Sequence, residues 1–161
     1  MVGQGVLMDA ESLQRAVLAL FPGATAREKT DRPSLAVAAS SVPDLLTRLK
    51  ADEQLAFDVL LDHTAVDWIE RGRIELFYQL YSLKHGHYLT VAAEVPREEP
   101  VAFSVSGIHR IAEWQEREVY DMFGVLYEGH PDLRRLLLED SWIGHPLRKD
   151  YHDDHIIERS R

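Results

Sequence analysis

Charged residues and histidines that could do chemistry are concentrated between positions 113 and 155 of this 161-residue chain. Within this stretch Glu113, Arg117 and Asp121 recur at intervals of four residues, which places them on one side of a helix. Because a cation lies between the two acids, both are expected to stay ionised, which disfavours a catalytic acid–base pair. The spacing by itself therefore predicts a solvated ladder of salt bridges.

Four of the eight histidines belong to the same stretch. His130 and His145 each stand within a Gly-His-Pro triplet, whereas His152 and His155 flank two aspartates. Imidazole and carboxylate groups suit zinc, so a metal site at this end is one interpretation. The segment is polar and offers no apolar shell that would hold ligands in place, which favours a solvated tail or a partner contact instead.

Paired basic residues form a third group, Arg134-Arg135 and Arg148-Lys149, each beside leucines in a glycine- and proline-containing segment. Arginine is favoured at protein interfaces because its planar group pairs with carboxylates while its stem becomes buried. We expect Asp132 and Asp150 to orient these cations. We further expect Arg148 and Lys149 to contact acidic groups of a partner protein.

Composition excludes several classes of function. The chain has no cysteine, which excludes disulfides, thiolate zinc sites and all-cysteine iron–sulfur ligation. It has no glycine-rich nucleotide-binding loop, so NADH or flavin binding on this chain is unsupported. The net charge of −9 disfavours a nonspecific nucleic-acid binder. No apolar run approaches the ~20 residues of a membrane helix, so we expect a soluble, cytoplasmic chain.

The elements that must position these residues can be predicted from periodicity and capping signals. Asp9 can cap a helix over 10–21, and Ser41 with Asp44 has capping-box-like spacing before a second helix that contains Leu45 and Leu49. Strand patterns cover 35–39, 57–68, 74–83 and 88–95, with a tight hairpin at 84–86. This order favours an α+β fold in two layers, with helices packed on one mixed β-sheet.

After the sheet, the pattern changes to a helix and then to an irregular segment. Ser106 can cap a helix over 107–123, and Gly124 stands where a left-handed residue would end it. Beyond Gly124 there is little periodicity, yet the segment keeps large apolar residues. We therefore predict a body over 1–124 and an extended, irregular, partner-binding arm over 125–161. Four apolar residues of the arm should be poorly covered within the monomer: Leu133, Leu136, Trp142 and Ile143.

Two runs in this region resemble the signature of one protein family. They are Glu116-Arg117-Glu118 followed by Asp121-Met122-Phe123-Gly124, and Gly144-His145-Pro146-Leu147-Arg148-Lys149-Asp150, with Gly129-His130-Pro131 and Arg134-Arg135 between them. The family is the 30 kDa subunit of proton-pumping NADH:quinone oxidoreductase (respiratory complex I), with relatives in chloroplast-type dehydrogenases and membrane-bound hydrogenases. The resemblance covers most of residues 55–151. His109 departs from it, because many relatives carry tryptophan there.

The resemblance implies a set of motif residues that lie among the partners of a complex, and no catalytic, cofactor-binding or metal-binding residue. These motif residues are Glu116, Arg117, Glu118, Asp121, Gly124, His130, Arg134, Arg135, His145, Pro146, Arg148, Lys149 and Asp150.

The implied function is that of a noncatalytic structural and assembly subunit in the cytoplasmic peripheral arm of proton-translocating NADH:quinone oxidoreductase. The expected partners are the larger 49 kDa-type subunit, which borders the quinone site, and other peripheral-arm subunits. Iron–sulfur clusters, FMN and quinone are expected on those partners, and membrane contact only through the complex. Two alternatives remain: the equivalent subunit of an energy-converting hydrogenase or related dehydrogenase, and a free metal-dependent hydrolase built on the histidine-rich end.

Overall fold

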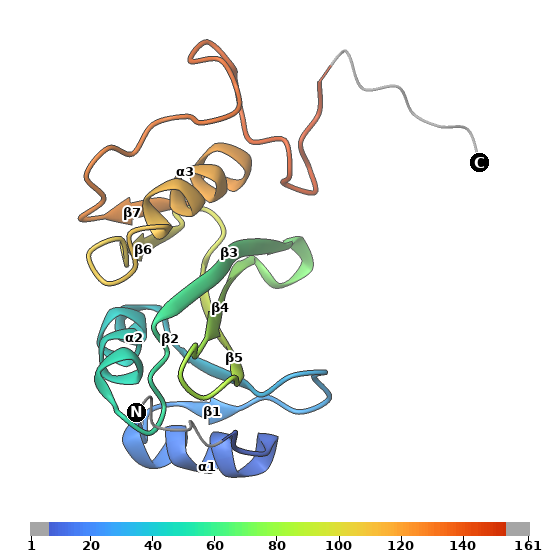
Figure 1. Ribbon diagram of the computed structural model, residues 1–161. Coiled ribbons are helices and arrows are strands. Elements are labelled where there is room, and N and C mark those ends of the chain that lie inside the picture. Colours follow the sequence, from blue (N-terminus) through green and yellow to red (C-terminus); the bar gives the residue numbers. More distant parts are fainter. Residues whose placement is uncertain (1–6, 154–161) are drawn as a thin grey trace.

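A five-stranded mixed β-sheet forms the centre of the fold in the computed structural model, which describes residues 7–153 (Figure 1). The strand order is β1-β2-β5-β4-β3, with β2 and β5 parallel and the other neighbours antiparallel. The α+β class is confirmed, because helices accompany one mixed sheet. The strands are β1 Thr25–Ala26, β2 Ser34–Ala38, β3 Val59–Trp68, β4 Arg73–Tyr81 and β5 Tyr88–Pro96.

Strand β4 forms close to the predicted range 74–83, and the alternation of its residues distinguishes its two faces. The core face carries Ile74, Leu76, Tyr78 and Leu80, which are almost completely buried, whereas Phe77 on the other face is only partly buried. Successive side chains of a strand point to opposite faces, so the first set forms the core side of the sheet. The β4–β5 hairpin also forms, with a loop that runs from Ser82 to His87.

One helix precedes β2 and another follows it. In α1 (Ala10–Leu20) the Asp9 carboxylate accepts a hydrogen bond from the Ser12 amide at 2.9 Å, which confirms the predicted cap. In α2 (Val42–Ala51) the predicted capping box is wrong, because Ser41 makes no side-chain cap bond. A 3₁₀ turn leads directly into this helix, so the Ser41 backbone is already helical (φ −91°, ψ −11°). Pro43, which has no amide hydrogen to satisfy, lies in the first helical turn.

The third helix, α3 (Ala112–Phe123), begins later than predicted. The preceding residues form turns in which the His109 amide donates to the Val105 carbonyl, and the Ser106 hydroxyl bonds Ser104 instead of capping a helix. Gly124 does end α3 in the left-handed region (φ 77°), as predicted. Figure 1 shows α3 with β6 and β7 at one end of the molecule, and α1 and α2 at the other.

A second sheet of two short parallel strands extends the body beyond the predicted limit at Gly124. Strands β6 (Val101–Phe103) and β7 (Leu126–Glu128) pair side by side, and neither was expected from the sequence. Val125 is completely buried, and the Tyr127 hydroxyl lies 2.5 Å from His63 Nε2 on β3. The body therefore continues to Glu128, because residues after the helix complete the core.

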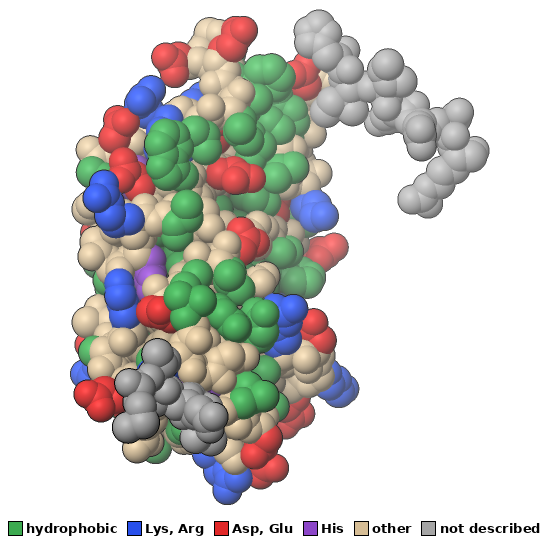
Figure 2. Space-filling view, in the orientation of Figure 1, with side chains coloured by type: hydrophobic (Ala, Val, Ile, Leu, Met, Phe, Trp, Pro, Cys, Tyr) green, Lys and Arg blue, Asp and Glu red, His purple; other side chains and the backbone are tan. Residues whose placement is uncertain are grey.

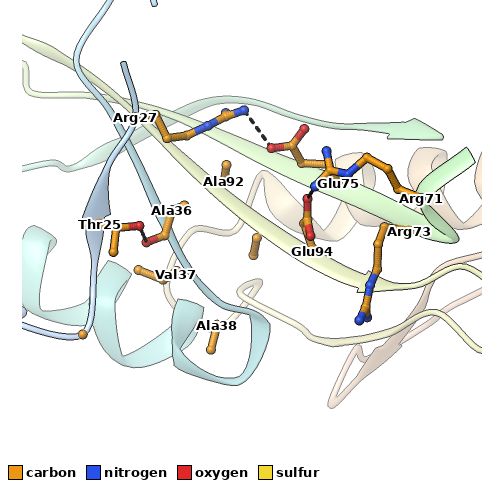
Figure 3. Close-up of a pocket in the computed structure, with 12 residues that line it drawn as sticks. Thr25, Arg27, Ala36, Val37, Ala38, Arg71, Arg73, Glu75, Ala92 and Glu94 are labelled. Atoms are coloured by element: carbon orange, nitrogen blue, oxygen red, sulfur yellow. Dashed lines mark hydrogen bonds and ion pairs between the residues drawn. The ribbon is translucent and has the colours of Figure 1, made fainter. Parts of the chain in front are cut away.

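The sheet face that carries Glu75 and Glu94 is hollowed (Figure 3). The hollow measures about 550 Å³, and its charged residues largely pair with each other. Arg27 contacts Glu75 at 2.8 Å, and Arg71 forms an ion pair with Glu94. Within residues 7–153, no helix is long and apolar enough to cross a membrane.

Burial of His63 makes the stability of this fold depend on pH. Its Nδ1–H donates to the Phe77 carbonyl at 2.9 Å, and its ring stacks on Tyr78. Burial lowers the pKa of His63 to about 4, although the Phe77 carbonyl acts in the opposite direction. An unfolded histidine titrates near pH ~6.5, so between about pH 6.5 and 4 the unfolded chain binds a proton that the folded chain does not.

The contribution of His63 to the unfolding free energy should therefore be complete above about pH 6.5. It should decrease as the pH falls from 6.5 towards 4. The loss that His63 contributes between pH 7 and pH 5 should be about 2 kcal/mol, and urea unfolding at both pH values would measure it. His63→Asn should reduce this difference, although it lowers stability at both pH values. His152→Asn is the control, since His152 is exposed. Equal pH dependence in the parent and His63→Asn would contradict the assignment.

Candidate partner interface

Residues 129–153, which we call the arm, follow β7 without forming a helix or strand. The arm runs across α3, as the orange and red trace in Figure 1 shows. Its position depends on polar contacts between its backbone and side chains of α3. Buried backbone donors and acceptors need such partners when no regular secondary structure supplies them.

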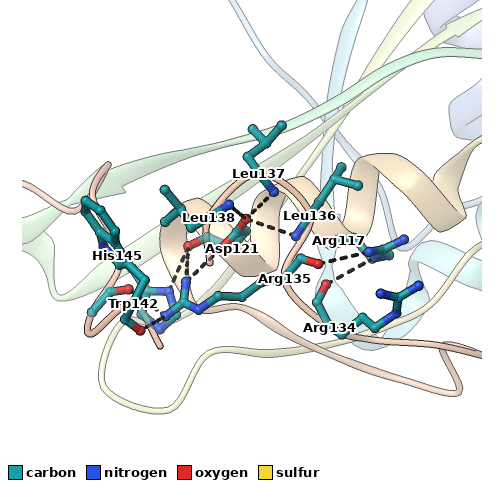
Figure 4. Close-up of polar contacts among 10 residues, drawn as sticks. Arg117, Asp121, Arg134, Arg135, Leu136, Leu137, Leu138, Trp142 and His145 are labelled. Carbon is teal, nitrogen blue, oxygen red and sulfur yellow. Dashed lines mark hydrogen bonds and ion pairs between the residues drawn. The ribbon is translucent and has the colours of Figure 1, made fainter. Parts of the chain in front are cut away.

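Asp121 is the centre of these contacts (Figure 4). Its buried carboxylate accepts the amide hydrogens of three consecutive arm residues, Leu136, Leu137 and Leu138, at 3.0, 2.7 and 3.0 Å. It also accepts a 2.7 Å bond from the Arg135 guanidinium. Burial alone would raise the pKa of Asp121, but the amide bonds and the Arg135 cation together hold it below its usual value.

Two arginines complete the attachment of this segment. Arg117 donates from Nε and Nη2 to the carbonyls of Arg134 and Arg135, at 3.1 and 2.9 Å (Figure 4). Arg135 donates from Nη2 to the carbonyls of Trp142 and Gly144, at 2.9 and 3.0 Å. The Arg135 guanidinium therefore connects Asp121 of α3 with residues 142–144 of the arm.

These contacts overturn the predicted salt-bridge ladder on α3. Asp121 pairs with Arg135 of the arm, and Arg117 binds arm carbonyls instead of the acids on its own helix. The spacing of four residues does place these side chains on one stripe. The arm covers that stripe, so Arg117 and Asp121 form hydrogen bonds with the backbone of the arm instead of with each other.

Glu116 and His130 attach the beginning of the arm. Glu116 is completely buried and accepts bonds from the Ser104 hydroxyl at 2.6 Å and the Val105 amide at 2.7 Å. Burial raises the pKa of Glu116. His130 donates from Nε2 to the Glu113 carbonyl at 2.9 Å, and its Nε2 lies 3.9 Å from Glu116 Oε2.

The motif run from Gly144 to Asp150 packs on the end of α3. The His145 ring lies against Gly124, and its Nδ1–H donates to the Asp121 carbonyl at 3.0 Å. The Leu147 amide donates to the Met122 carbonyl at 3.1 Å. Arg148 Nε donates to the Phe123 carbonyl at 2.7 Å. Arg148 therefore satisfies a helix-end carbonyl within the chain, and its expected contact with a partner stays a prediction.

The end of the described arm is held by Arg97 and Asp67, which the sequence-based site residues did not include. Arg97 binds Asp67 through two hydrogen bonds of 2.7 and 3.0 Å, and Asp150 at 2.5 Å. The Lys149 amide donates to Asp67 at 2.8 Å. The bond from Arg97 lowers the pKa of Asp67. A signal existed: Asp67 occupies an inward position of an alternating strand, where a charge requires a partner.

The expected pairing of acids with neighbouring cations holds in one case. Asp132 binds Arg134 at 2.8 Å on the surface. Asp150 binds Arg97 of the body instead of orienting Arg148 or Lys149. The predicted orientation by Asp150 is wrong, because Arg97 emerges from the end of β5 beside the arm.

The arm directs several apolar side chains outward. Ile143 is 89% exposed, and Leu137 and Leu147 are also more than half exposed. Leu133 was expected to be poorly covered, but it packs against the core. Figure 2 shows hydrophobic side chains gathered over α3 and the arm, among acidic ones. The exposed residues Ile111, Trp114 and Glu118 continue this surface along α3.

The metal site that was one interpretation of the histidine-rich end has no counterpart within the described part of the chain. No group of three histidine, aspartate or glutamate side chains there is placed to hold a metal ion. His155 lies outside the described residues.

Replacing Asp121 by Asn should detach the arm. The change removes the charge facing Arg135, and breaking a buried ion pair of this kind costs about 3–5 kcal/mol. Urea unfolding measures the loss, and limited trypsin digestion after Arg134 and Arg135 measures release of the arm. Asp132→Asn removes the charge of a solvent-exposed pair in the same segment and should change both results little. Equal losses in the two variants would contradict the central role of Asp121.

Replacing Gly124 by Ala should strain both the backbone and the packing of His145. An added Cβ would lie 2.6 Å from two atoms of that ring, and the left-handed backbone is unfavourable for alanine. Gly72→Ala is a matched control, since Gly72 has φ +60° but no heavy atom within 4 Å of an added Cβ. We expect a clearly larger fall in Tm for Gly124→Ala. A similar fall in both would assign the effect to backbone strain alone.

Comparison with known proteins identifies the family. The family model for the 30 kDa subunit of respiratory-chain NADH dehydrogenase matches residues 35–155. The corresponding NADH-quinone oxidoreductase subunit of Moorella thermoacetica is 42% identical over 141 residues, which cover 88% of this chain and 91% of the relative. The corresponding subunit of Jannaschia sp. is 44% identical over 119 residues, 73% of this chain and 57% of that longer relative.

Solved structures agree with the sequence comparison. A chain of the membrane-bound sulfane sulfur reductase, an archaeal respiratory membrane complex, has a TM-score of 0.71 and 30% identity, with 88% of this chain and 85% of that chain covered. A trypsin-resistant fragment of Nqo5 has a TM-score of 0.67 and 27% identity, with 78% of this chain and all of the fragment covered. The chain therefore belongs to the family of the 30 kDa subunit of respiratory-chain NADH dehydrogenase.

Proposed function

We propose that this chain is a noncatalytic structural and assembly subunit in the peripheral arm of a proton-translocating NADH:quinone oxidoreductase. Membership of the 30 kDa subunit family supports this role. We further propose that α3 and the arm dock on the 49 kDa-type subunit that borders the quinone site, with other peripheral-arm subunits nearby.

The observation that carries the docking proposal is the division of polar and apolar groups in the arm. Polar groups at Asp121, Arg117 and Arg135 are used within the chain, whereas Ile143 and Leu147 are directed outward. A large exposed apolar patch on an ordered segment marks an interaction site. Because the arm is already ordered, less conformational entropy is lost when a partner covers it.

Electron transfer is proposed to take place on the partners. Iron–sulfur clusters, FMN and quinone would belong to other subunits, which agrees with the absence of cysteine from this sequence. The isolated chain would then be inactive, and the complex would carry the oxidoreductase activity. The chain would lie on the cytoplasmic face of the membrane, held there by its partners.

A second candidate is the equivalent role in another membrane-bound respiratory complex, such as an energy-converting hydrogenase or a related dehydrogenase. The similarity of this chain to a chain of the sulfane sulfur reductase complex supports this second candidate. The two candidates differ in the large subunit that accompanies the chain. Co-purification followed by mass spectrometry of that large subunit separates them.

Replacing Ile143 by Asp tests the docking surface. Ile143 is 89% exposed, so the change should leave the Tm of the isolated chain almost unchanged. A charge in the centre of an apolar interface should reduce recovery of the complex with a tagged chain, and NADH:quinone reductase activity, by about tenfold or more.

Leu83→Asp is the matched control, since Leu83 is 68% exposed in the β4–β5 loop, far from the arm. Assembly should proceed normally with this variant. Normal assembly with Ile143→Asp as well would remove the arm from the interface.

A further inference from the structure

A small groove lies between β3 and the C-terminal half of α3, beside the arm. It encloses about 150 Å³, less than the roughly 300 Å³ at which small-molecule sites begin, so its size suits a single side chain. Its lining combines apolar walls with two acids: Val119, Met122, Phe123, Leu147, His63, Thr64, Asp62 and Glu118.

The two carboxylates of the groove have no side-chain partner among residues 7–153. Asp62 and Glu118 are both exposed, and neither forms an ion pair or a side-chain hydrogen bond there. His63, the only imidazole of the groove, uses both ring nitrogens within the core, for Phe77 and Tyr127. The groove therefore presents two uncompensated negative charges and no cation among its lining residues.

Glu118 also differs from the other charged residues of its motif. Glu116 is buried against Ser104, Arg117 binds arm carbonyls, and Asp121 holds the arm amides. Glu118 makes no such contact within the described chain. Its stripe of α3 instead continues through the exposed residues Trp114 and Ile111, about one helical turn apart.

We propose that this groove receives one arginine or lysine side chain of the protein that covers the arm. The aliphatic stem of that residue would lie on Met122 and Leu147, and its cationic group would bind Asp62 and Glu118. Leu147 belongs both to the groove and to the exposed arm surface, so one partner can cover both. The inference rests on the proposed function and specifies the chemistry of the partner.

Charge reversal at Glu118 tests this inference in the assembled complex. We expect Glu118→Lys to lower recovery of partner subunits with a tagged chain by about tenfold or more, because two cations would then meet in the groove. Glu118→Gln should give a smaller loss. Asp62→Lys should behave like Glu118→Lys, and the Tm of each isolated variant should stay near that of the parent.

Glu28→Lys and Asp31→Lys are the matched controls, because both acids are exposed between β1 and β2, away from α3. They apply the same change of charge to the chain. Assembly of Glu118→Lys at the level of Glu28→Lys would overturn the inference. So would a fall in the Tm of Glu118→Gln, which would assign Glu118 a role within the fold.

The two proposals fail in different ways. If Ile143→Asp prevents assembly and Glu118→Lys does not, the arm docks but the groove takes no cation. If the unchanged chain recovers no peripheral-arm subunit at all, the proposed function fails, and the inference fails with it.

Discussion

The structure around the arm depends on one buried carboxylate. Asp121 accepts hydrogen bonds from three consecutive backbone amides and from a guanidinium. Its carboxylate thereby replaces the water that those donors would otherwise bind. A segment without helix or strand lacks regular backbone pairing, so its buried amides need acceptors from elsewhere, and here a neighbouring helix supplies one. Through Arg135 the same carboxylate is coupled to the carbonyls of Trp142 and Gly144, so it links residues 136–138 of the arm to residues 142–144.

This arrangement reverses the usual distribution of polar and apolar groups in a surface segment. The charges of Arg117, Asp121 and Arg135 are directed inward, into contacts between α3 and the arm, whereas large apolar side chains such as Ile143 remain in water. Exposed apolar surface of this kind stabilises the protein only when another surface covers it and removes it from water. The ion pair of Arg97 and Asp67 holds the far end in the same way, since it also binds Asp150 and the Lys149 amide.

The sequence by itself determined the features that depend on neighbours within a few residues. The cap at Asp9, the alternation along β4 and the helix end at Gly124 follow from local geometry, because a turn or a strand repeat brings those residues together in any fold. The family could also be recognised, since its motif consists of short runs that follow one another between residues 116 and 150. The same local reasoning indicated that residues after Gly124 form an irregular, partly apolar arm.

Only the tertiary structure decided which groups the charges bind. Spacing allowed Arg117 and Asp121 to pair on their helix, but burial beneath the arm redirected both to its backbone. The contact between Asp67 and Arg97 joins residues 30 positions apart, and the short strands β6 and β7 have too few residues for a periodic signal. Such contacts depend on which surfaces become buried together, and burial is a property of the whole chain rather than of any local segment.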